Sequence, residues 1–494
     1  MINYIYCMTK PNHWFDAAED LYKKNIAKPV IWLGDDYHEK RAKDLFGENI
    51  LSMQDHVHYP YKVDIKDIKI KNSSFFTSQN YLRAKDRCLK MMDRIDLFGL
   101  LSRIDRETYF NKLCIIFISA IEKKSPTALI MAEAPHSHAQ YLLFEISKYY
   151  KIEIAWFNNW MIGPIMNLQN MNTMEYVKRK NNSNIDHIEA YYGLVDNFIK
   201  NIKDKWEGNF DHQYMVDQVN ELKFPNRLVN FIKKDFEFIV RQSYRNLRDR
   251  ILDNYNPINP YNFGIITQLK IKRKRRNNLY KLNDKFSSSI LPKGNFIFFA
   301  LHYEHERNTN PDGDIYHEQL IALLRLRNFI PRDIEIVIKE HPTQIYQEER
   351  GPRGRSPLIY EVISSLNGVK LLKYNFDSTT LQKKALFTAS ITGTASLEAA
   401  INGGKGLIFG NAWYKGCPNI YHFDSLESYD LFSEKKIESL KSISDFFKNQ
   451  MLNYCIPANQ NFSAELRNKD AIQENFYKHQ KDGIEDLMSS FLEQ

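Results

Sequence analysis

The segment "EIVIKEHPTQ" joins a short apolar run to residue types that bind phosphate. Lys339 and His341 alternate along an extended chain, so their side chains share one face while Glu340 points to the other. A lysine offers a point charge to a phosphate, and a histidine offers a directional donor. Pro342 ends the strand and fixes the turn. This pattern predicts a phosphate-binding strand end; a surface histidine before a proline turn is the alternative.

A second segment, "SITGTASLEAAINGG", places a turn between an apolar run and a helix-like run. Gly393 lets the backbone approach a ligand, and the N–H groups at a helix N-terminus favour an anion. Glu398 lies one turn into the helix, where a carboxylate can accept from ribose hydroxyls. The pattern predicts a nucleotide site, and a plain helix N-cap is the alternative. The hydroxyl donors of the turn are Thr392, Thr394 and Ser396.

A third segment, "FALHYEHERNTNPDGD", follows another apolar run and is densely polar. Glu304 and Glu306 are spaced by two, and either could act as a nucleophile or base. A zinc site is not expected, because the spacing of the histidines and acids lacks the helical HExxH geometry. The alternative is a charged loop. The polar residues concerned are His302, Glu304, His305, Glu306, Arg307 and Thr309.

The first half of the chain has weaker candidates of the same kind. In "AEAPHSHAQ", Glu133, His136 and His138 follow an apolar run, where they could supply a general base or orient an acceptor hydroxyl. An N-cap turn is the equal alternative. Asp35, in "GDD", follows a further apolar run and is a similar candidate.

The segment "RGPRGRSPLIY" is rich in glycine and arginine. Arg353 or Arg355 could pair with a carboxylate or a phosphate, because the guanidinium presents a fork of donors. A solvated loop is the equal alternative.

Elements that alternate between strand and helix must position these residues. Short apolar runs bounded by turn residues alternate with longer helix-like runs in both halves, which predicts two doubly wound, Rossmann-like α/β domains. Ligands bind off the carboxyl ends of strands in such sheets, where all the motifs above fall. The expected strands are 29–34, 128–135, 151–158, 295–301, 334–340, 368–374, 386–391 and 405–410.

The length of 494 residues predicts more than one domain. Apolar residues at three- and four-residue spacing after position 185 predict a helical insert, and an Asn/Pro-rich stretch marks a connection. The predicted parts are an acceptor-side domain (1–184), the insert (185–255), a basic linker (256–293), a nucleotide-sugar domain (294–430) and C-terminal helices that pack back on the first domain (431–494).

Composition and local patterns argue against a membrane-spanning protein, a secreted protein and a disulfide-stabilised protein. No apolar run reaches the ~20 residues of a membrane span, and the N-terminus lacks the pattern of a secretory signal. The five cysteines are scattered without a CxxC pair, which favours a reducing cytoplasm. Lys and Arg exceed Asp and Glu by 68 to 60. The cluster Lys270–Arg276 could attract an anionic membrane surface, or it could be a solvated linker; no nucleic-acid motif accompanies it.

The order of "FALHYEHERNT", "VIKEHP", "TGTASLEAA" and "GKGLIFGNAWY" resembles the bacterial capsular polysaccharide biosynthesis family, which contains transferases of Kdo and related acidic sugars. The resemblance covers about 295–415, and the first half matches only in layout. The KxHP element is also similar to bacterial sialyltransferases and CDP-glycerol glycerophosphotransferases. All of these use a cytidine nucleotide donor.

The resemblance implies a GT-B fold, with two domains facing across a cleft, and transfer of Kdo, sialic acid or another nonulosonic acid from a CMP donor. Glu306 or Glu304 lies where the proposed nucleophile of the Kdo transferases lies. From their residue types rather than from the resemblance, Glu133 is a further catalytic candidate, and the acceptor-side candidates are His136, His138 and Asp35. The donor site would comprise Lys339, His341, Pro342, Thr392, Gly393, Thr394, Ser396, Glu398 and His302.

Two positions depart from the family pattern. His302 lies where the relatives place a glutamine before the acid, so retaining and inverting outcomes both stay open. Gly406 replaces the proline of their Gly-Lys-Pro. Neither a metal nor another cofactor is expected, since Lys339, His341 and a helix N-terminus can share the phosphate charge. A CDP-glycerol-type transferase and a non-catalytic subunit of a capsule assembly complex are the alternatives to a cytoplasmic, membrane-peripheral glycosyltransferase.

Overall fold

The computed structural model describes residues 1–34, 36–47, 50–52, 68–93, 102–180, 188–208, 265–304, 309–346, 351–469 and 475–493, with scattered positions between 220 and 247. The chain divides into two compact units. Unit 1 comprises Met1–Met92, Ser102–Phe198 and Asp445–Gln494, and unit 2 comprises Asp93–Leu101 and Ile199–Ser444.

Unit 1 is built on a sheet in the order β13-β6-β5-β4-β1-β2-β3, which is parallel from β5 to β3, while β6 is antiparallel to both of its neighbours. Its strands are β1 (Ile2–Cys7), β2 (Ala27–Gly34), β3 (Ile50–Ser52), β4 (Ala128–Met131), β5 (Glu153–Asn159), β6 (Ile165–Asn170) and β13 (Cys455–Pro457). Its helices are α1 (Asn12–Lys23), α2 (Asp36–Phe46), η1 (Ser74–Thr77), α4 (Gln79–Asp93), α5 (Arg103–Lys124), α6 (His138–Tyr149), α20 (Phe462–Asn468) and α21 (Phe476–Leu492).

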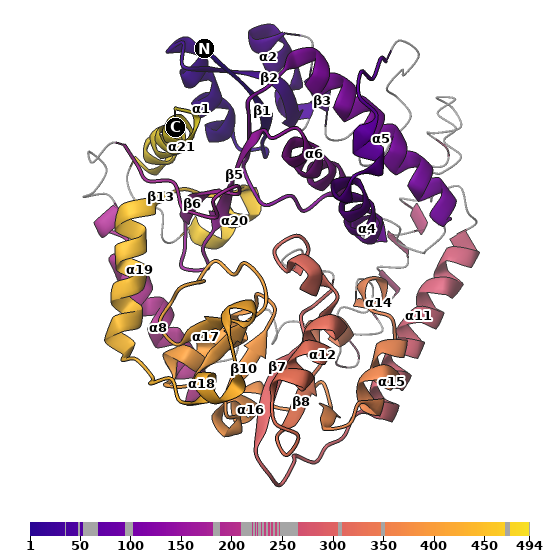
Figure 1. Ribbon diagram of the computed structural model, residues 1–494. Coiled ribbons are helices and arrows are strands. Elements are labelled where there is room, and N and C mark those ends of the chain that lie inside the picture. Colours follow the sequence, from indigo (N-terminus) through magenta and orange to yellow (C-terminus); the bar gives the residue numbers. More distant parts are fainter. Residues whose placement is uncertain are drawn as a thin grey trace. The chain divides into compact units, whose positions relative to one another are not determined.

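Both faces of the unit 1 sheet are covered. Tyr4 and Tyr6, two residues apart on β1, share a core cluster with Trp14 of α1 and Leu487 of α21. Figure 1 shows α21 beside α1, although these helices lie at opposite ends of the chain. Helices α5 and α6 contact each other and pack on β2 and β5. The C-terminal segment therefore contributes both a helix and the edge strand β13 to this unit.

Unit 2 contains a parallel sheet in the order β9-β8-β7-β10-β11-β12. Numbered along the chain, this is the 3-2-1-4-5-6 order of a doubly wound sheet. Its strands are β7 (Phe296–Ala300), β8 (Glu335–Lys339), β9 (Val369–Leu372), β10 (Thr388–Ser390), β11 (Gly406–Ile408) and β12 (Ile420–His422). Its helices are α11 (Ile265–Phe286), η5 (Asp314–His317), α12 (Gln319–Phe329), α13 (Pro342–Tyr346), α14 (Gly351–Gly354), α15 (Leu358–Ser365), α16 (Ser378–Lys384), α17 (Thr394–Ile401), η6 (Phe423–Ser425) and α18 (Tyr429–Ser433).

The central strand β7 of unit 2 is apolar at all five positions (FIFFA), because both of its faces are buried. Ile297 and Phe299 of β7 belong to one core cluster, and Phe296 and Phe298 belong to a second on the opposite face. The expected α/β class with two doubly wound, Rossmann-like units is confirmed. Helices α8 (Tyr192–Trp206) and α19 (Leu440–Tyr454) each have residues in both units.

The predicted boundaries need corrections. The expected basic linker is wrong for residues 265–286, which form α11; Leu279 of this helix is 2% exposed and belongs to the unit 2 core. One side of α11 packs against the core of unit 2, so the basic run belongs to a packed helix and not to a linker. The segment 431–494, expected to form C-terminal helices, also contains strand β13. The predicted insert is described mainly through α8, and most of the rest lies outside the described residues.

Cys7, Cys88, Cys114, Cys417 and Cys455 are all buried with free thiols. Within the described residues, the structure contains no helix long and apolar enough to cross a membrane.

Candidate anion-binding site in unit 2

The strand order of unit 2 reverses between β7 and β10, and the carboxyl ends of these strands define its topological switch point. Ligands of doubly wound sheets bind in the crevice at this point. The chain leaving β7 carries His302 and Glu304, and the chain leaving β10 carries Thr392 and Gly393. The fold therefore brings together two of the polar segments singled out in the sequence, with the end of β8 alongside β7.

The turn after β10 is filled by a histidine ring. His302 Nε2 accepts from the backbone N–H groups of Ile391, Thr392 and Gly393 at 3.1, 3.2 and 3.2 Å. Because Nε2 accepts, the ring proton is on Nδ1. Burial, with the nearby charge of Arg355, lowers the pKa of His302 to about 4, so the ring is neutral near pH 7. The N–H groups expected to be free for an anion are thus occupied by His302.

Gly393 allows the turn to approach that ring closely. A Cβ atom on Gly393 would lie 3.0 Å from Cε1 and 3.1 Å from Nε2 of His302. The carbonyl of Gly393 accepts from the hydroxyls of Ser390, at 2.9 Å, and Tyr414. The turn is therefore held from both sides. Tyr414, the last residue of the segment "GKGLIFGNAWY" but not a predicted site residue, is one of its anchors.

Lys339 and His341 lie on one face at the end of β8. Lys339 Nζ donates to the Phe376 carbonyl at 3.0 Å, and burial lowers its pKa to about 8 despite the nearby Asp377. His341 Nδ1 accepts from the Thr343 N–H at 3.2 Å, which leaves the proton on Nε2. Burial lowers the pKa of His341 to about 3. His341 is therefore a neutral, oriented donor rather than a second cation.

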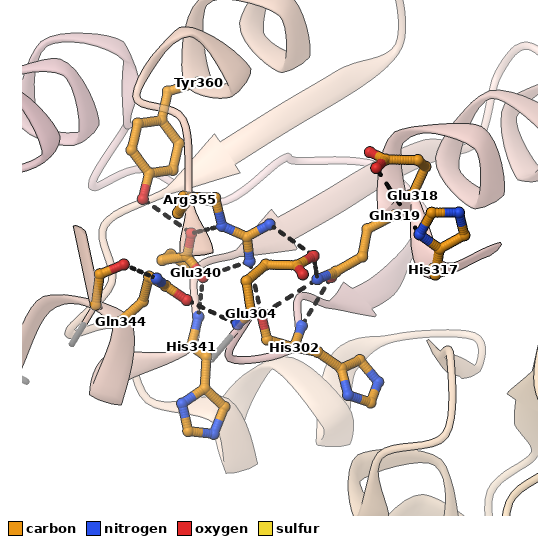
Figure 2. Close-up of polar contacts among 11 residues, drawn as sticks. His302, Glu304, His317, Glu318, Gln319, Glu340, His341, Gln344, Arg355 and Tyr360 are labelled. Atoms are coloured by element: carbon orange, nitrogen blue, oxygen red, sulfur yellow. Dashed lines mark hydrogen bonds and ion pairs between the residues drawn. The ribbon is translucent and has the colours of Figure 1, made fainter. Parts of the chain in front are cut away.

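A buried ion-pair network lies behind these two histidines. The Arg355 guanidinium lies 3.0 Å from Glu340 Oε2 and 3.3 Å from Glu304 Oε1, and it donates to the His302 carbonyl at 2.6 Å. Tyr360 donates its hydroxyl proton to Glu340 at 2.8 Å. Figure 2 shows the rings of His302 and His341 pointing away from this network. Glu340 faces the opposite way from His341, as strand alternation predicts.

Two glycines let the segment that carries Arg355 approach the strand ends. A Cβ on Gly354 would lie 2.8 Å from the Glu304 carbonyl oxygen, and one on Gly351 would lie 1.9 Å from that of Gln344. Of the two alternatives for Arg355, pairing with carboxylates is the one found. The side chain of Arg353 lies outside the described residues.

The expected catalytic role of Glu304 does not fit its position. Its side chain is buried, paired with Arg355, and accepts from the amide of Gln319. A carboxylate held this way lacks access to a substrate, so we assign it a structural role. Glu306, the other candidate, lies outside the described residues.

The predicted donors of the β10–α17 turn separate into two groups. Ser396 is fully buried, and its hydroxyl lies 2.8 Å from that of Ser390 and donates to the Leu407 carbonyl at 2.9 Å, so its expected ligand role is wrong. Thr394, the first residue of α17, instead donates to Glu398 Oε1 at 3.3 Å. Thr392 is buried, and Pro342 is the buried first residue of α13.

Glu398 is paired with a lysine that sequence analysis missed. Lys205 Nζ lies 3.1 Å from both carboxylate oxygens. Lys205 is near the end of α8, within the part of that helix that belongs to unit 2. An amphipathic helix carries many lysines, so nothing in the sequence distinguished this one.

Asp312 is a further carboxyl group near the switch point. Its backbone carbonyl accepts from the Asn411 N–H at 2.7 Å. Gly410, which precedes Asn411, fits closely here, since a Cβ on it would lie 2.5 Å from that carbonyl oxygen and 2.7 Å from Thr392 Cγ2. Burial raises the pKa of Asp312 to about 7. A carboxyl group that titrates near neutrality suits general acid–base chemistry.

The candidates of the first half lie in unit 1. His138 is the buried first residue of α6, and its Nε2 lies 3.2 Å from the Tyr109 hydroxyl, so its expected acceptor-side role is replaced by packing. The N-cap alternative holds here, with Ser137 as the cap. Glu133 follows β4 and accepts from Gln460 at 2.5 Å. His136 is half-buried in the same loop, and Asp35 lies outside the described residues.

No family model and no curated protein matches the chain. Among solved structures, it is similar to the KpsC beta Kdo 2,7 transferase of Thermosulfurimonas dismutans (15% identity, 41% of this chain, 61% of that chain, TM-score 0.24). It is also similar to the KpsC beta Kdo 2,4 transferase of that organism (11% identity, 70% of this chain, 87% of that chain, TM-score 0.25). A third similar structure is the UDP-GlcNAc 2-epimerase of Methanocaldococcus jannaschii (10% identity, 95% of this chain, 99% of that chain, TM-score 0.21). Because these TM-scores are all low, the function proposed below rests on the chain's own residues.

Proposed function

We propose that the protein is a GT-B glycosyltransferase that moves an acidic sugar, such as Kdo or a nonulosonic acid, from a CMP donor to a glycan or lipid-linked acceptor of a surface polysaccharide. The observation that carries this proposal is the convergence of Lys339, His341 and the β10–α17 turn at the switch point of unit 2. A cation and a neutral donor, beside the positive end of the α17 dipole, suit a phosphate monoester, although the N–H groups of the turn itself are taken by His302.

In this mechanism the protein acts mainly by positioning and by neutralising charge. Lys339 and the Nε2–H of His341 hold the phosphate of the donor, which stabilises CMP as it leaves. His302 offers its Nδ1–H while its Nε2 stays bound to the turn. These groups take up the leaving charge, so we propose that neither a metal nor another cofactor is needed.

We propose Glu306 and Asp312 as the carboxyl groups for the chemical step. Both lie in the chain that leaves β7, and the pKa of Asp312 suits a base near neutrality. Glu133 and His136 in unit 1 are the proposed acceptor-side groups. Glu306→Gln and Asp312→Asn should each lower the rate of sugar transfer without lowering CMP affinity. If both variants transfer sugar at the parent rate, neither carboxyl group takes part in the chemical step. If the parent protein itself transfers sugar from none of the donors, a non-catalytic subunit becomes the better description.

The donor class is tested by following which nucleotide is released from a panel of donors. The panel contains CMP-Kdo, a CMP-nonulosonate, CDP-glycerol and UDP-GlcNAc. We expect release of CMP from the CMP-sugars alone, measured by chromatography with and without acceptor. Release of CMP from CDP-glycerol, as glycerophosphate is transferred, would replace the proposal with a glycerophosphotransferase, and release of UDP would remove the cytidine assignment.

We also propose that the basic run of α11 holds the protein on an anionic membrane that carries the acceptor. Lys270, Arg273, Lys274 and Arg275 are exposed on this helix, and each basic residue near such a surface contributes about 1 kcal/mol. Vesicle sedimentation should show binding to anionic vesicles at low salt, and weaker binding at high salt or after Lys274→Glu and Arg275→Glu. Equal binding to neutral vesicles would contradict the proposal.

A further inference from the structure

Glu398, expected to accept from a ribose, is already saturated with donors. Lys205 Nζ contacts both of its carboxylate oxygens at 3.1 Å. The Thr394 hydroxyl donates to Oε1, and the Gln382 amide donates to Oε2, each at 3.3 Å. A carboxylate accepts about four hydrogen bonds. Glu398 therefore has no lone pair left for a ribose hydroxyl while Lys205 stays in place.

Lys205 is the more accessible member of this pair. Its side chain is 22% exposed, against 11% for that of Glu398. An ammonium group has three donors, and the carboxylate takes two of them. Lys205 can therefore make another contact without leaving Glu398, whereas Glu398 cannot.

The position of Lys205 places it beside the proposed phosphate site. The Thr394 hydroxyl, which shares the Glu398 carboxylate with Lys205, belongs to the residue directly after Gly393. The charge of Lys205 also contributes to the lowered pKa of both Lys339 and His341, after the larger effect of their burial. A ligand with two negative charges would relieve the repulsion between the two lysines.

We propose that Lys205 is a second phosphate-binding residue and that Glu398 is the positioning residue that holds its ammonium group at the site. This rests on the proposed function only in taking a phosphate as the ligand. The site then has two cations, Lys205 and Lys339, which matches the charge of a phosphate monoester above its second pKa of about 6.

The test compares affinities for CMP, cytidine and inorganic pyrophosphate by calorimetry. We expect Lys205→Met to weaken CMP and pyrophosphate by about tenfold or more, as for a lost charged hydrogen bond, and to leave cytidine unchanged. Lys203→Met removes an equal charge from an exposed position of the same helix. It should change the affinity for CMP and for pyrophosphate by no more than about twofold. Lys205→Arg keeps the charge and should recover most of the affinity.

Combining Lys205→Met with Glu398→Gln removes both charges at once. The proposal expects the double variant to bind CMP as weakly as Lys205→Met. Recovery to the parent affinity would overturn it, because the single variant would then act only by exposing the Glu398 charge. A ribose-binding Glu398 would instead make Glu398→Gln weaken cytidine and CMP alike.

Failure of this inference is separable from failure of the proposed function. If the parent protein binds CMP and Lys205→Met binds it equally well, the inference fails and the CMP donor stands. If the parent protein binds pyrophosphate but not CMP, and Lys205→Met weakens pyrophosphate, the inference stands and the CMP donor falls. Binding of neither ligand by the parent protein overturns both.

Discussion

Replacing Arg355 with methionine is expected to lower the free energy of unfolding of unit 2 by about 3–5 kcal/mol, the range for breaking a buried ion pair. The guanidinium is buried between Glu340 and Glu304, and its removal leaves two carboxylates without a cation in the core. Burial already raises the pKa of Glu340, and loss of the arginine should raise it further. Proton uptake by Glu340 will therefore make the loss smaller at low pH.

Urea denaturation followed by fluorescence measures this change. Arg325→Met is the matched control, because Arg325 makes an exposed ion pair with Asp424 at 2.7 Å, and such pairs contribute about 1 kcal/mol or less. Adding Glu304→Gln and Glu340→Gln to Arg355→Met should recover part of the stability, since no unpaired charge remains. If Arg355→Met is no more destabilising than Arg325→Met, the network does not support the fold.

Replacing His341 with alanine is expected to weaken CMP binding by roughly 10- to 100-fold, the cost of a hydrogen bond to a charged group. His341 remains neutral because burial lowers its pKa to about 3, and the bond from the Thr343 N–H leaves Nε2–H as the donor. Calorimetric titration with CMP measures the change. His422→Ala, at the end of the edge strand β12, is the control and should bind CMP normally. Unchanged affinity in His341→Ala would remove the donor-site assignment.

The pH dependence of CMP affinity should come from Lys339. Burial lowers its pKa to about 8, so the lysine loses its proton as the pH rises through 8. Above that pH, binding must recharge the lysine at about 1.4 kcal/mol per pH unit, and affinity should fall by up to tenfold per unit. Lys339→Arg stays charged and should flatten the profile between pH 7 and 9.5. A steep fall that persists in this variant would assign the titration to another group.

The sequence alone indicated where five of the six strands in the unit 2 sheet lie and which residues follow them, but it did not predict the edge strand β12. The largely apolar runs before His302, Lys339 and Thr392 contain β7, β8 and β10, because strands buried on both faces favour apolar residues. Alternation along an extended chain also fixed Lys339 and His341 on the face opposite Glu340. These features depend on local periodicity, which a single sequence displays.

Only the tertiary structure decided which polar groups are already paired. His302 fills a turn 89 to 91 residues further along the chain, and Lys205 reaches Glu398 across 193 residues. Ser396 and Thr394 are alike in sequence, yet the first points into the core and the second points to Glu398. Partners of this kind are set by the order of strands in the sheet and by how helices pack on it, and neither leaves a pattern at the residues themselves. Periodicity therefore located the candidate site, and tertiary contacts determined which of its side chains remain available to a ligand.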